Sequence, residues 1–195
     1  MERAPTPSQD TVSPTEPTGD VGLLEAARRD PGAFAHLYHR YADRLFRYAL
    51  ACTRSGALAE DIVSDTMVTA LEQLDRFDPA RGSVGNWLFG IARHRIADEQ
   101  RLRARLRRAL SRHPPEQAED VALVVIRDEQ AARVDAAIGR LRAADREVLA
   151  LRYGAELSAA EIGAVLGIAD GTARVRQHRA LRRLKDELGS ERDDG

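Results

Sequence analysis

The sequence predicts an all-α fold, made of two small helical domains joined by a flexible linker, with a helix-turn-helix in the second domain. Three observations support this prediction. Apolar residues recur at helical spacing in both halves of the chain, and no segment alternates apolar and polar residues as a half-buried strand would. An acidic segment that contains prolines separates the halves. The second half carries the cap and glycine signals of two helices joined by a tight turn.

Residues 1–20 are predicted to form a disordered tail. They are rich in Pro, Thr, Ser and acidic residues, and such a segment cannot bury enough apolar surface to offset the entropy cost of ordering. The tail lacks the apolar core of a secretory signal, and no apolar run approaches the ~20 residues that span a bilayer. The single Cys52 excludes an intrachain disulfide and a cysteine-based zinc cluster. We therefore expect a cytoplasmic protein without membrane insertion.

Residues 21–110 are predicted to form the first helical domain. Apolar side chains fall on one face of a long helix, at Phe34, Leu37, Tyr38, Tyr41, Leu45 and Tyr48. A second helix repeats the pattern at Ala59, Ile62, Val63, Thr66, Ala70 and Leu74. The sequence FDPARGSVG then predicts a loop, because Pro79, Gly82 and Gly85 interrupt the pattern. Ser83 is placed to cap a further helix that extends into RIADEQRLRARLRRAL and buries Val84, Trp87, Leu88 and Ile91.

The prolines that follow His113 end this helix. Residues 111–126 are predicted to be a linker, whose apolar patch at residues 121–126 can lie on the body of the protein or on a partner. Residues 127–188 are predicted to form the second domain, and residues 189–195 an acidic tail. The segments AARVDAAIGRL and DREVLALRY predict the first two helices of that domain, the second ending near Gly154.

The helix-turn-helix is predicted from residue types at fixed spacing. Ser158 and Glu161 have the spacing of a capping box at the start of a helix. Gly167 is suited to the left-handed residue that ends this helix. Asp170 is placed to cap the next helix, whose first amides near Thr172 can bind a phosphate.

That next helix is strongly basic. Residues 171–185 contain no acidic residue and six basic ones, namely Arg174, Arg176, Arg179, Arg182, Arg183 and Lys185. A solvated face that closes a helical bundle would also explain such a run. The capping box, the glycine turn and the basic helix together favour DNA binding in the major groove.

Two other charged surfaces are predicted. Residues 93–112 contain eight arginines against two acids, which indicates a second nucleic-acid contact. Acidic residues recur along one helix face with one apolar residue among them, at Asp61, Asp65, Val68, Glu72 and Asp75. DNA would be repelled by this acidic stripe. It is either a solvated face or a protein interface, and Val68 and the neighbouring Met67 favour the interface.

Two segments of the chain resemble a known family. The segment from Ala59 to Arg103 resembles the second conserved region of bacterial RNA polymerase sigma factors, and the segment from Leu141 to Leu184 resembles their fourth region. The short linker resembles that of the extracytoplasmic-function (ECF) group of the sigma-70 class. The resemblance extends from about Ala33 to Leu188, and the order of both blocks makes it specific.

The resemblance implies three contacts. The acidic stripe, Asp61, Asp65, Val68, Glu72 and Asp75, would dock on core RNA polymerase. The minus-ten promoter element would be bound by Arg81, Ser83, Asn86, Trp87, Arg93, His94, Arg95 and Arg101. The minus-thirty-five element would be bound by Thr172, Arg174, Val175, Arg176 and Arg179. For Trp87 we favour a core position over base stacking. Val175 stands where the family commonly has Ser, which favours contact with a thymine methyl group.

The resemblance also implies promoter-specific transcription initiation, regulated by an anti-sigma protein. We expect no catalysis and no cofactor. We also expect no metal site, because His36 and His39 have no third ligand near them in sequence. Two other functions remain open at this point. One is a stand-alone transcriptional regulator that uses only the helix-turn-helix, and the other is a helical adaptor whose arginines pair with an acidic partner.

Overall fold

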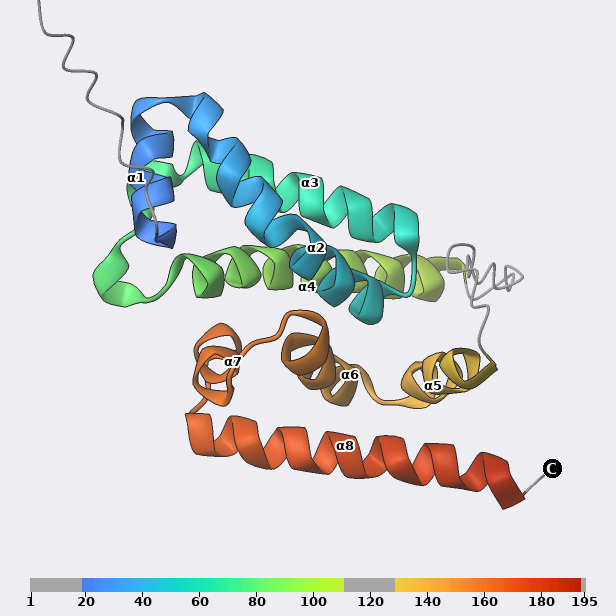
Figure 1. The fold of residues 1–195 in the computed structure, drawn as a ribbon. Helices are drawn as coiled ribbons and strands as arrows, with labels where there is room; N and C mark the ends of the chain where they lie inside the picture. The colour runs from blue at the N-terminus through green and yellow to red at the C-terminus, as the bar shows by residue number, and fades with distance from the viewer. Residues whose placement is uncertain (1–18, 111–128, 194–195) are drawn as a thin grey trace, which may run out of the picture.

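The computed structural model describes residues 19–110 and 129–193, and every regular element in these ranges is helical (Figure 1). The all-α prediction is therefore confirmed. The predicted linker and nearly all of the predicted N-terminal tail lie outside the described residues. Residues 19–110 are called the N-terminal half below, and residues 129–193 the C-terminal half.

The N-terminal half consists of four α-helices and three short 3-10 helices. The α-helices are α1 (Asp20–Arg29), α2 (Phe34–Thr53), α3 (Gly56–Glu72) and α4 (Val84–Leu110). The 3-10 helices are η1 (Pro31–Ala33), η2 (Leu74–Arg76) and η3 (Pro79–Arg81). Arg54 ends α2 in the left-handed conformation with φ 57°, and Ser55 caps α3 by accepting a hydrogen bond from the amide of Leu58.

The predicted apolar faces of α2 and α3 are buried, with one exception, whereas on α4 Val84 and Leu88 are buried and Trp87 and Ile91 are half-buried. Tyr38 is 45% exposed, whereas Phe34, Leu37, Tyr41, Leu45 and Tyr48 lie in the core. Tyr38 lies at the edge of the stripe, where its ring meets His39 edge-on. The predicted face of α3 is buried throughout, although Leu74 belongs to η2 rather than to α3.

The C-terminal half contains four α-helices and one π-helical turn. They are α5 (Glu129–Arg140), α6 (Ala143–Leu149), the π turn η4 (Ala150–Gly154), α7 (Ala159–Leu166) and α8 (Asp170–Asp193). The capping box of Ser158 and Glu161 is confirmed, and Gly167 has the left-handed φ of 68°. The prediction that Asp170 caps α8 is wrong. Asp170 is the first residue of the helix, and its carboxylate pairs instead with Arg174 one turn later.

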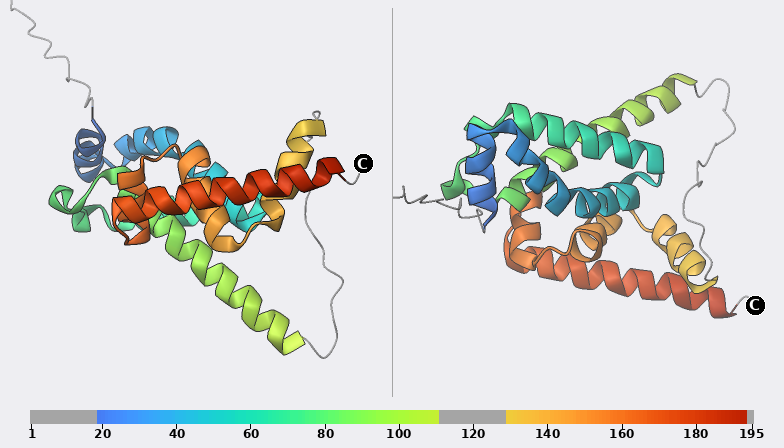
Figure 2. Two further views of the ribbon diagram at one scale, coloured as in Figure 1. Left: turned by 90° about the horizontal axis from the view of Figure 1, so that it is seen from below. Right: turned by 45° about the horizontal axis from the view of Figure 1, so that its top comes forward.

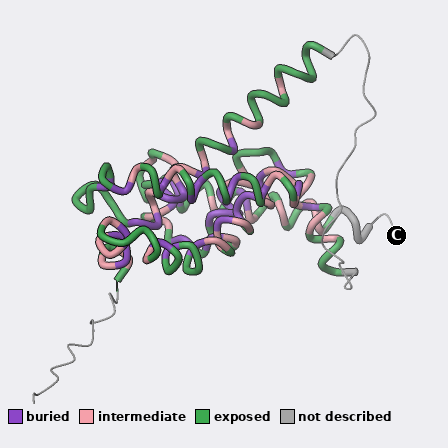
Figure 3. Tube along the Cα trace, turned by 90° about the horizontal axis from the view of Figure 1, so that it is seen from above, coloured by how far each residue is buried: buried purple, intermediate pink, exposed green. Residues whose placement is uncertain are grey.

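The two halves pack against each other over one continuous hydrophobic core. In Figures 1 and 2 the C-terminal half covers one side of α2 and α4, while the C-terminal part of α4 extends away from the body. Residues of η4 and α7, such as Leu151 and Ile162, belong to the same buried cluster as Tyr48 and Phe89 of the N-terminal half. The buried positions accordingly run through the centre of the molecule in Figure 3, and the end of α4 is exposed.

Polar contacts also join the halves. Arginines of α2 donate to backbone carbonyls of η4 and the residue after it: Arg44 Nη2 to Ala155 at 2.6 Å and Arg47 Nε to Gly154 at 2.8 Å. Arg54 forms a two-pronged ion pair with Asp135, with N to O distances of 2.9 and 2.7 Å. A planar guanidinium suits such paired contacts.

Candidate nucleic-acid interface

The basic face of α8 is open to solvent. Its sequence-predicted DNA residues are all exposed, namely Thr172, Arg174, Val175, Arg176 and Arg179. Val175 is 48% exposed and is the one apolar side chain among these five residues. The opposite side of α8 carries Ala173 and Ala180, which are fully buried. Small residues on the packed side bring α8 close to its own domain and leave the arginines facing outwards.

The turn between α7 and α8 is tightly packed. A Cβ placed on Gly163 would lie 2.7 Å from the backbone carbonyl oxygen of Ile168, closer than real Cβ contacts come. Only glycine therefore allows the turn to approach α7 this closely. Farther along α8, Arg183 pairs with Asp145 of α6.

A second candidate surface is the loop between α3 and α4. Within it Arg81 and Ser83 are exposed, and the predicted cap is confirmed because the amide of Asn86 donates to Ser83 Oγ at 3.1 Å. Asn86 Oδ1 is buried and has no hydrogen-bond partner among the described residues. A buried acceptor of this kind is costly unless a hydrogen-bond donor from a water or a ligand reaches it.

Trp87 is half-buried and lies against Phe77, with the ring centroids 5.3 Å apart and the planes tilted by 48°. Trp87 thus packs against the edge of the core, as expected, although it is not fully buried. Phe77, which was not among the predicted site residues, is 7% exposed and supports the loop by packing against Trp87.

The basic residues of α4 divide into two groups. His94, Arg95 and Arg101 are exposed, and their side-chain bonds are short-range or reach only the neighbouring helix α3. Arg93 differs, because its Nε donates to the carboxylate of Glu147 on α6 at 3.0 Å. The structure therefore places Arg93 against the C-terminal half rather than on an open DNA surface.

The acidic stripe is exposed along α3. Asp61, Asp65, Val68 and Glu72 all face solvent, and Val68 is 53% exposed. The fifth member, Asp75, lies beyond α3 in η2, where its side chain is 97% exposed.

The interpretation that Met67 shares this surface is wrong. Met67 is 4% exposed and belongs to the core, because it follows the buried face of α3 with Val63 and Ala70. Next to the stripe, a groove between α3 and α4 brings Asp61 and Asp65 close to Arg95, Arg101 and Leu102.

Burial at the junction of the halves favours the neutral forms of two side chains, Cys52 and Tyr48. Burial raises the pKa of the Cys52 thiol to about 12, with the nearby Glu147 carboxylate adding to the effect. Burial likewise raises the pKa of Tyr48, whose hydroxyl lies 3.4 Å from Glu147. Cys52 is therefore a poor nucleophile in this conformation.

Among the described residues, no group of His, Cys, Asp and Glu is arranged to hold a metal ion. The helices in that part of the chain also include none that is both long and apolar enough for a membrane span.

Comparison with known proteins identifies both halves. The family model of sigma-70 region 2 matches residues 37–108, and that of sigma-70 region 4 matches residues 137–186. The ECF RNA polymerase sigma factor RpoE of Cereibacter sphaeroides is 31% identical over 176 residues, covering 86% of this chain and 94% of that protein. The ECF RNA polymerase sigma factor SigL of Mycobacterium tuberculosis is 34% identical, covering 84% of this chain and 95% of that protein.

Solved structures agree with this match. The sigma factor RpoE of Bartonella quintana, in complex with the anti-sigma factor NepR, is 26% identical with a TM-score of 0.68 and covers 80% of this chain and 96% of its own. CnrH in complex with the cytosolic domain of CnrY is 28% identical with a TM-score of 0.65, covering 88% and 97%. The chain therefore belongs to the ECF sigma factors of the sigma-70 class, with region 2 in its N-terminal half and region 4 in its C-terminal half.

Proposed function

We propose that this sigma factor binds core RNA polymerase through the acidic stripe of α3 and reads a promoter with two separate elements. The observation that supports this most is the placement of one acidic and two basic surfaces on different exposed helices. Region 2 and region 4 are both matched, which favours a sigma factor over a stand-alone regulator that would need only the helix-turn-helix. The chain supplies specificity in the cytoplasm, and the polymerase carries out RNA synthesis.

The polymerase contact is built from Asp61, Asp65, Val68 and Glu72. Exposed carboxylates flank an exposed apolar side chain on one helix face. Such a surface fits a partner with basic residues around an apolar centre, since charge complementarity steers binding and apolar burial holds it. Asp75 lies at the end of the same surface, in η2.

The minus-ten contact is built from the loop before α4 and the first turns of that helix. The buried, unpartnered Oδ1 of Asn86 is an acceptor that an unstacked base can satisfy. Arg81 and Ser83 lie exposed at the rim, and Trp87 supports the loop through Phe77. His94, Arg95 and Arg101 continue along α4 as contacts to phosphates. Arg93 joins them only after it has left Glu147.

The minus-thirty-five contact is α8. Its exposed N-terminal turn at Thr172 offers backbone amides to a phosphate, and Arg174, Val175, Arg176 and Arg179 face the major groove.

Both contacts require the halves to separate. The names of the two elements place them about 25 base pairs apart, which is roughly 85 Å of B-DNA at about 3.4 Å per pair. Halves that share one hydrophobic core do not span such a distance. The closed arrangement is thus the form of the free chain, and polymerase binding opens it.

An anti-sigma protein regulates this chain in our proposal. The similar RpoE of Bartonella quintana was solved with an anti-sigma factor bound. A partner that covers the acidic stripe would block polymerase binding, and one that also holds the halves together would keep Arg93 paired with Glu147.

The polymerase contact is tested by charge reversal. Asp61→Arg with Asp65→Arg is expected to abolish co-elution with core polymerase while duplex binding by α8 stays unchanged. Asp43→Arg, an exposed acid on α2, serves as the control. Unchanged co-elution of the double variant would contradict the assignment of the acidic stripe and would mean that another surface of the chain binds polymerase.

The opening is tested with Cys52. Alkylation of Cys52, followed by mass spectrometry, should be slow in the free chain and faster once core polymerase is added. Equal rates in both states would contradict the opening.

A further inference from the structure

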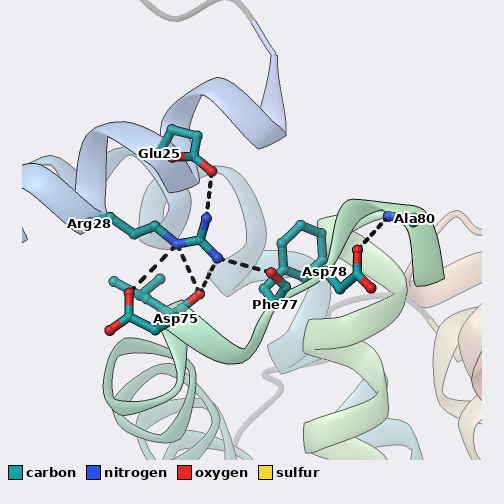
Figure 4. A network of polar contacts seen from close by, with 7 residues as sticks. Glu25, Arg28, Asp75, Phe77, Asp78 and Ala80 are labelled. Carbon is teal, nitrogen blue, oxygen red and sulfur yellow. Dashed lines mark hydrogen bonds and ion pairs between the residues drawn. The ribbon is translucent and has the colours of Figure 1, made fainter.

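The loop that carries the proposed minus-ten contacts is held from outside by α1. Arg28 Nη2 donates to the carbonyl oxygens of Leu74 at 2.7 Å and Phe77 at 2.9 Å, and its Nε donates to Leu74 at 3.1 Å (Figure 4). These carbonyls lie 46 and 49 residues farther along the chain. The side chain of Arg28 is only 23% exposed, so these bonds form largely away from solvent.

The chemistry of the contact requires an arginine. The carbonyl oxygen of Leu74, the first residue of η2, accepts the amide of Phe77 at 3.3 Å and has a second lone pair for Arg28, while the carbonyl of Phe77 lies directly beyond the end of η2. A guanidinium carries several N–H donors in a fixed planar fork and can hold two carbonyls at once, whereas a lysine ammonium is a flexible point charge. Glu25 pairs with Nη1 of Arg28, and Asp75 lies 3.8 Å from Nε, so the fork is oriented from two further sides.

The loop geometry follows from this anchor. Beyond Phe77, Asp78 accepts a hydrogen bond from the amide of Ala80 at 2.9 Å and starts η3. The chain then passes Ser83, whose hydroxyl accepts from Asn86 and starts α4. Arg28 therefore holds the start of this loop, at Leu74 and Phe77, whereas the later turns are held by the local caps Asp78 and Ser83.

We propose that Arg28 is a positioning residue for minus-ten recognition: it sets the backbone at Leu74 and Phe77 so that the loop residues and Asn86 meet the captured base. This proposal rests on the proposed function of the loop. Arg28 itself does not touch DNA. Its removal leaves the fold of α8 intact, because the hydrogen bonds and ion pairs of Arg28 reach residues of α1, η2 and the loop and none of region 4.

The experiment uses holoenzyme assembled from the full chain and core polymerase. The DNA probe is a fork template with a constant duplex upstream region and a randomised single-stranded minus-ten region. Bound templates are recovered and sequenced, and the preference at each randomised position is compared for wild type, Arg28→Ala and Arg28→Lys. Arg29→Ala, the exposed neighbour on α1, is the control. Melting temperatures and co-elution with core are measured alongside.

Wild type should show a sharp preference at one or more positions, and Arg28→Ala should reduce it by about tenfold, since small misplacements of recognition groups are costly. Arg28→Lys should retain part of the preference and Arg29→Ala all of it, with co-elution unchanged. An equal preference in wild type and Arg28→Ala would overturn the proposal and leave the function of the loop standing. If Arg28→Ala does not fold, an unchanged preference in Arg28→Lys overturns it. A wild type without any preference would overturn the proposed function of the loop itself, and the role of Arg28 with it.

Discussion

The two proposed DNA-reading elements of this sigma factor are built in different ways. The recognition helix α8 is set by near neighbours in sequence, through the capping box at Ser158 and the left-handed Gly167. The loop before α4 is set by Arg28, from a helix 46 residues earlier. A base-reading helix can thus arise from local signals, whereas a base-capturing loop needs tertiary support. Substitutions far away in the sequence should therefore disturb the geometry of the loop and leave that of α8 unchanged.

The largest expected effect is on the support of the loop. Phe77→Ala removes a ring that is 7% exposed and packs on Trp87, and we expect a loss of about 3 kcal/mol in the free energy of unfolding. Single-stranded minus-ten binding should fall with it, while the folded fraction should still bind duplex DNA through α8. Urea unfolding measures the first effect and fluorescence anisotropy the second. Tyr38→Ala, at a site 45% exposed, should cost about 1 kcal/mol or less. Equal costs for the two variants would contradict this support.

The matching change in the helix-turn-helix is Gly163→Ala. The new methyl group would lie 2.7 Å from the carbonyl oxygen of Ile168, so the turn must shift at a cost of about 1–3 kcal/mol. Duplex binding should weaken and single-stranded binding should persist, which is the reverse of the pattern for Phe77→Ala. Gly189→Ala, on α8 with nothing within 4 Å of the added Cβ, should be neutral or slightly stabilising. The comparison fails if Gly163→Ala weakens both kinds of binding alike.

A smaller effect concerns the junction between the halves. Burial raises the pKa of Cys52 from 9.0 to about 12, so the neutral thiol is favoured in the folded chain. Its contribution to stability is complete below pH 9 and is lost as the pH rises from 9 towards 12. Between pH 8 and pH 10 this loss is about 1 kcal/mol. Urea unfolding at both pH values measures the free energy of unfolding. Its fall from pH 8 to pH 10 should be smaller by this amount in Cys52→Ala than in the wild type. An identical fall in both proteins would refute the burial of the thiol.

The smallest expected effect on stability is that of Val175→Ser. Val175 is 48% exposed on α8, so the free energy of unfolding should change by no more than about 0.5 kcal/mol. The preferred minus-thirty-five sequence should nevertheless change, because a thymine methyl group would lose its apolar contact. Selection from a randomised duplex measures the preference. Val21→Ser, at a site 42% exposed on α1, should leave it unaltered. An unaltered preference in Val175→Ser would remove this residue from the reading surface.

Local signals made much of the fold predictable. The buried faces of α2 and α3, the Ser83 cap, the capping box and Gly167 each depend on residues within a turn or two of one another. Tyr38 and Met67 were misjudged because their places at the edge of a stripe, or just inside it, depend on which helix packs beside them. The prediction for Asp170 was wrong by one helix position, because α8 begins at Asp170 itself, and its carboxylate pairs with Arg174.

Contacts between distant segments were not predictable. Nothing near Arg28 in the sequence indicates that it holds Leu74 and Phe77, and nothing near Arg93 indicates its pairing with Glu147. The shared core of the two halves was also not predictable, because the apolar residues of η4 and α7 would equally suit a core confined to their own half. Such features depend on how elements meet in space, which periodicity along one helix does not specify.

Transcription with purified components tests most directly whether this chain directs promoter-specific initiation. The chain is mixed with core RNA polymerase and a library of promoter fragments, and the transcripts are sequenced. Transcripts should start only when the chain is present, and only from fragments that share a minus-ten and a minus-thirty-five element. A folded chain, free of inhibitor, that yields no specific transcripts would contradict its role in initiation. Transcribed fragments that share only one of the two elements would contradict the two-element promoter.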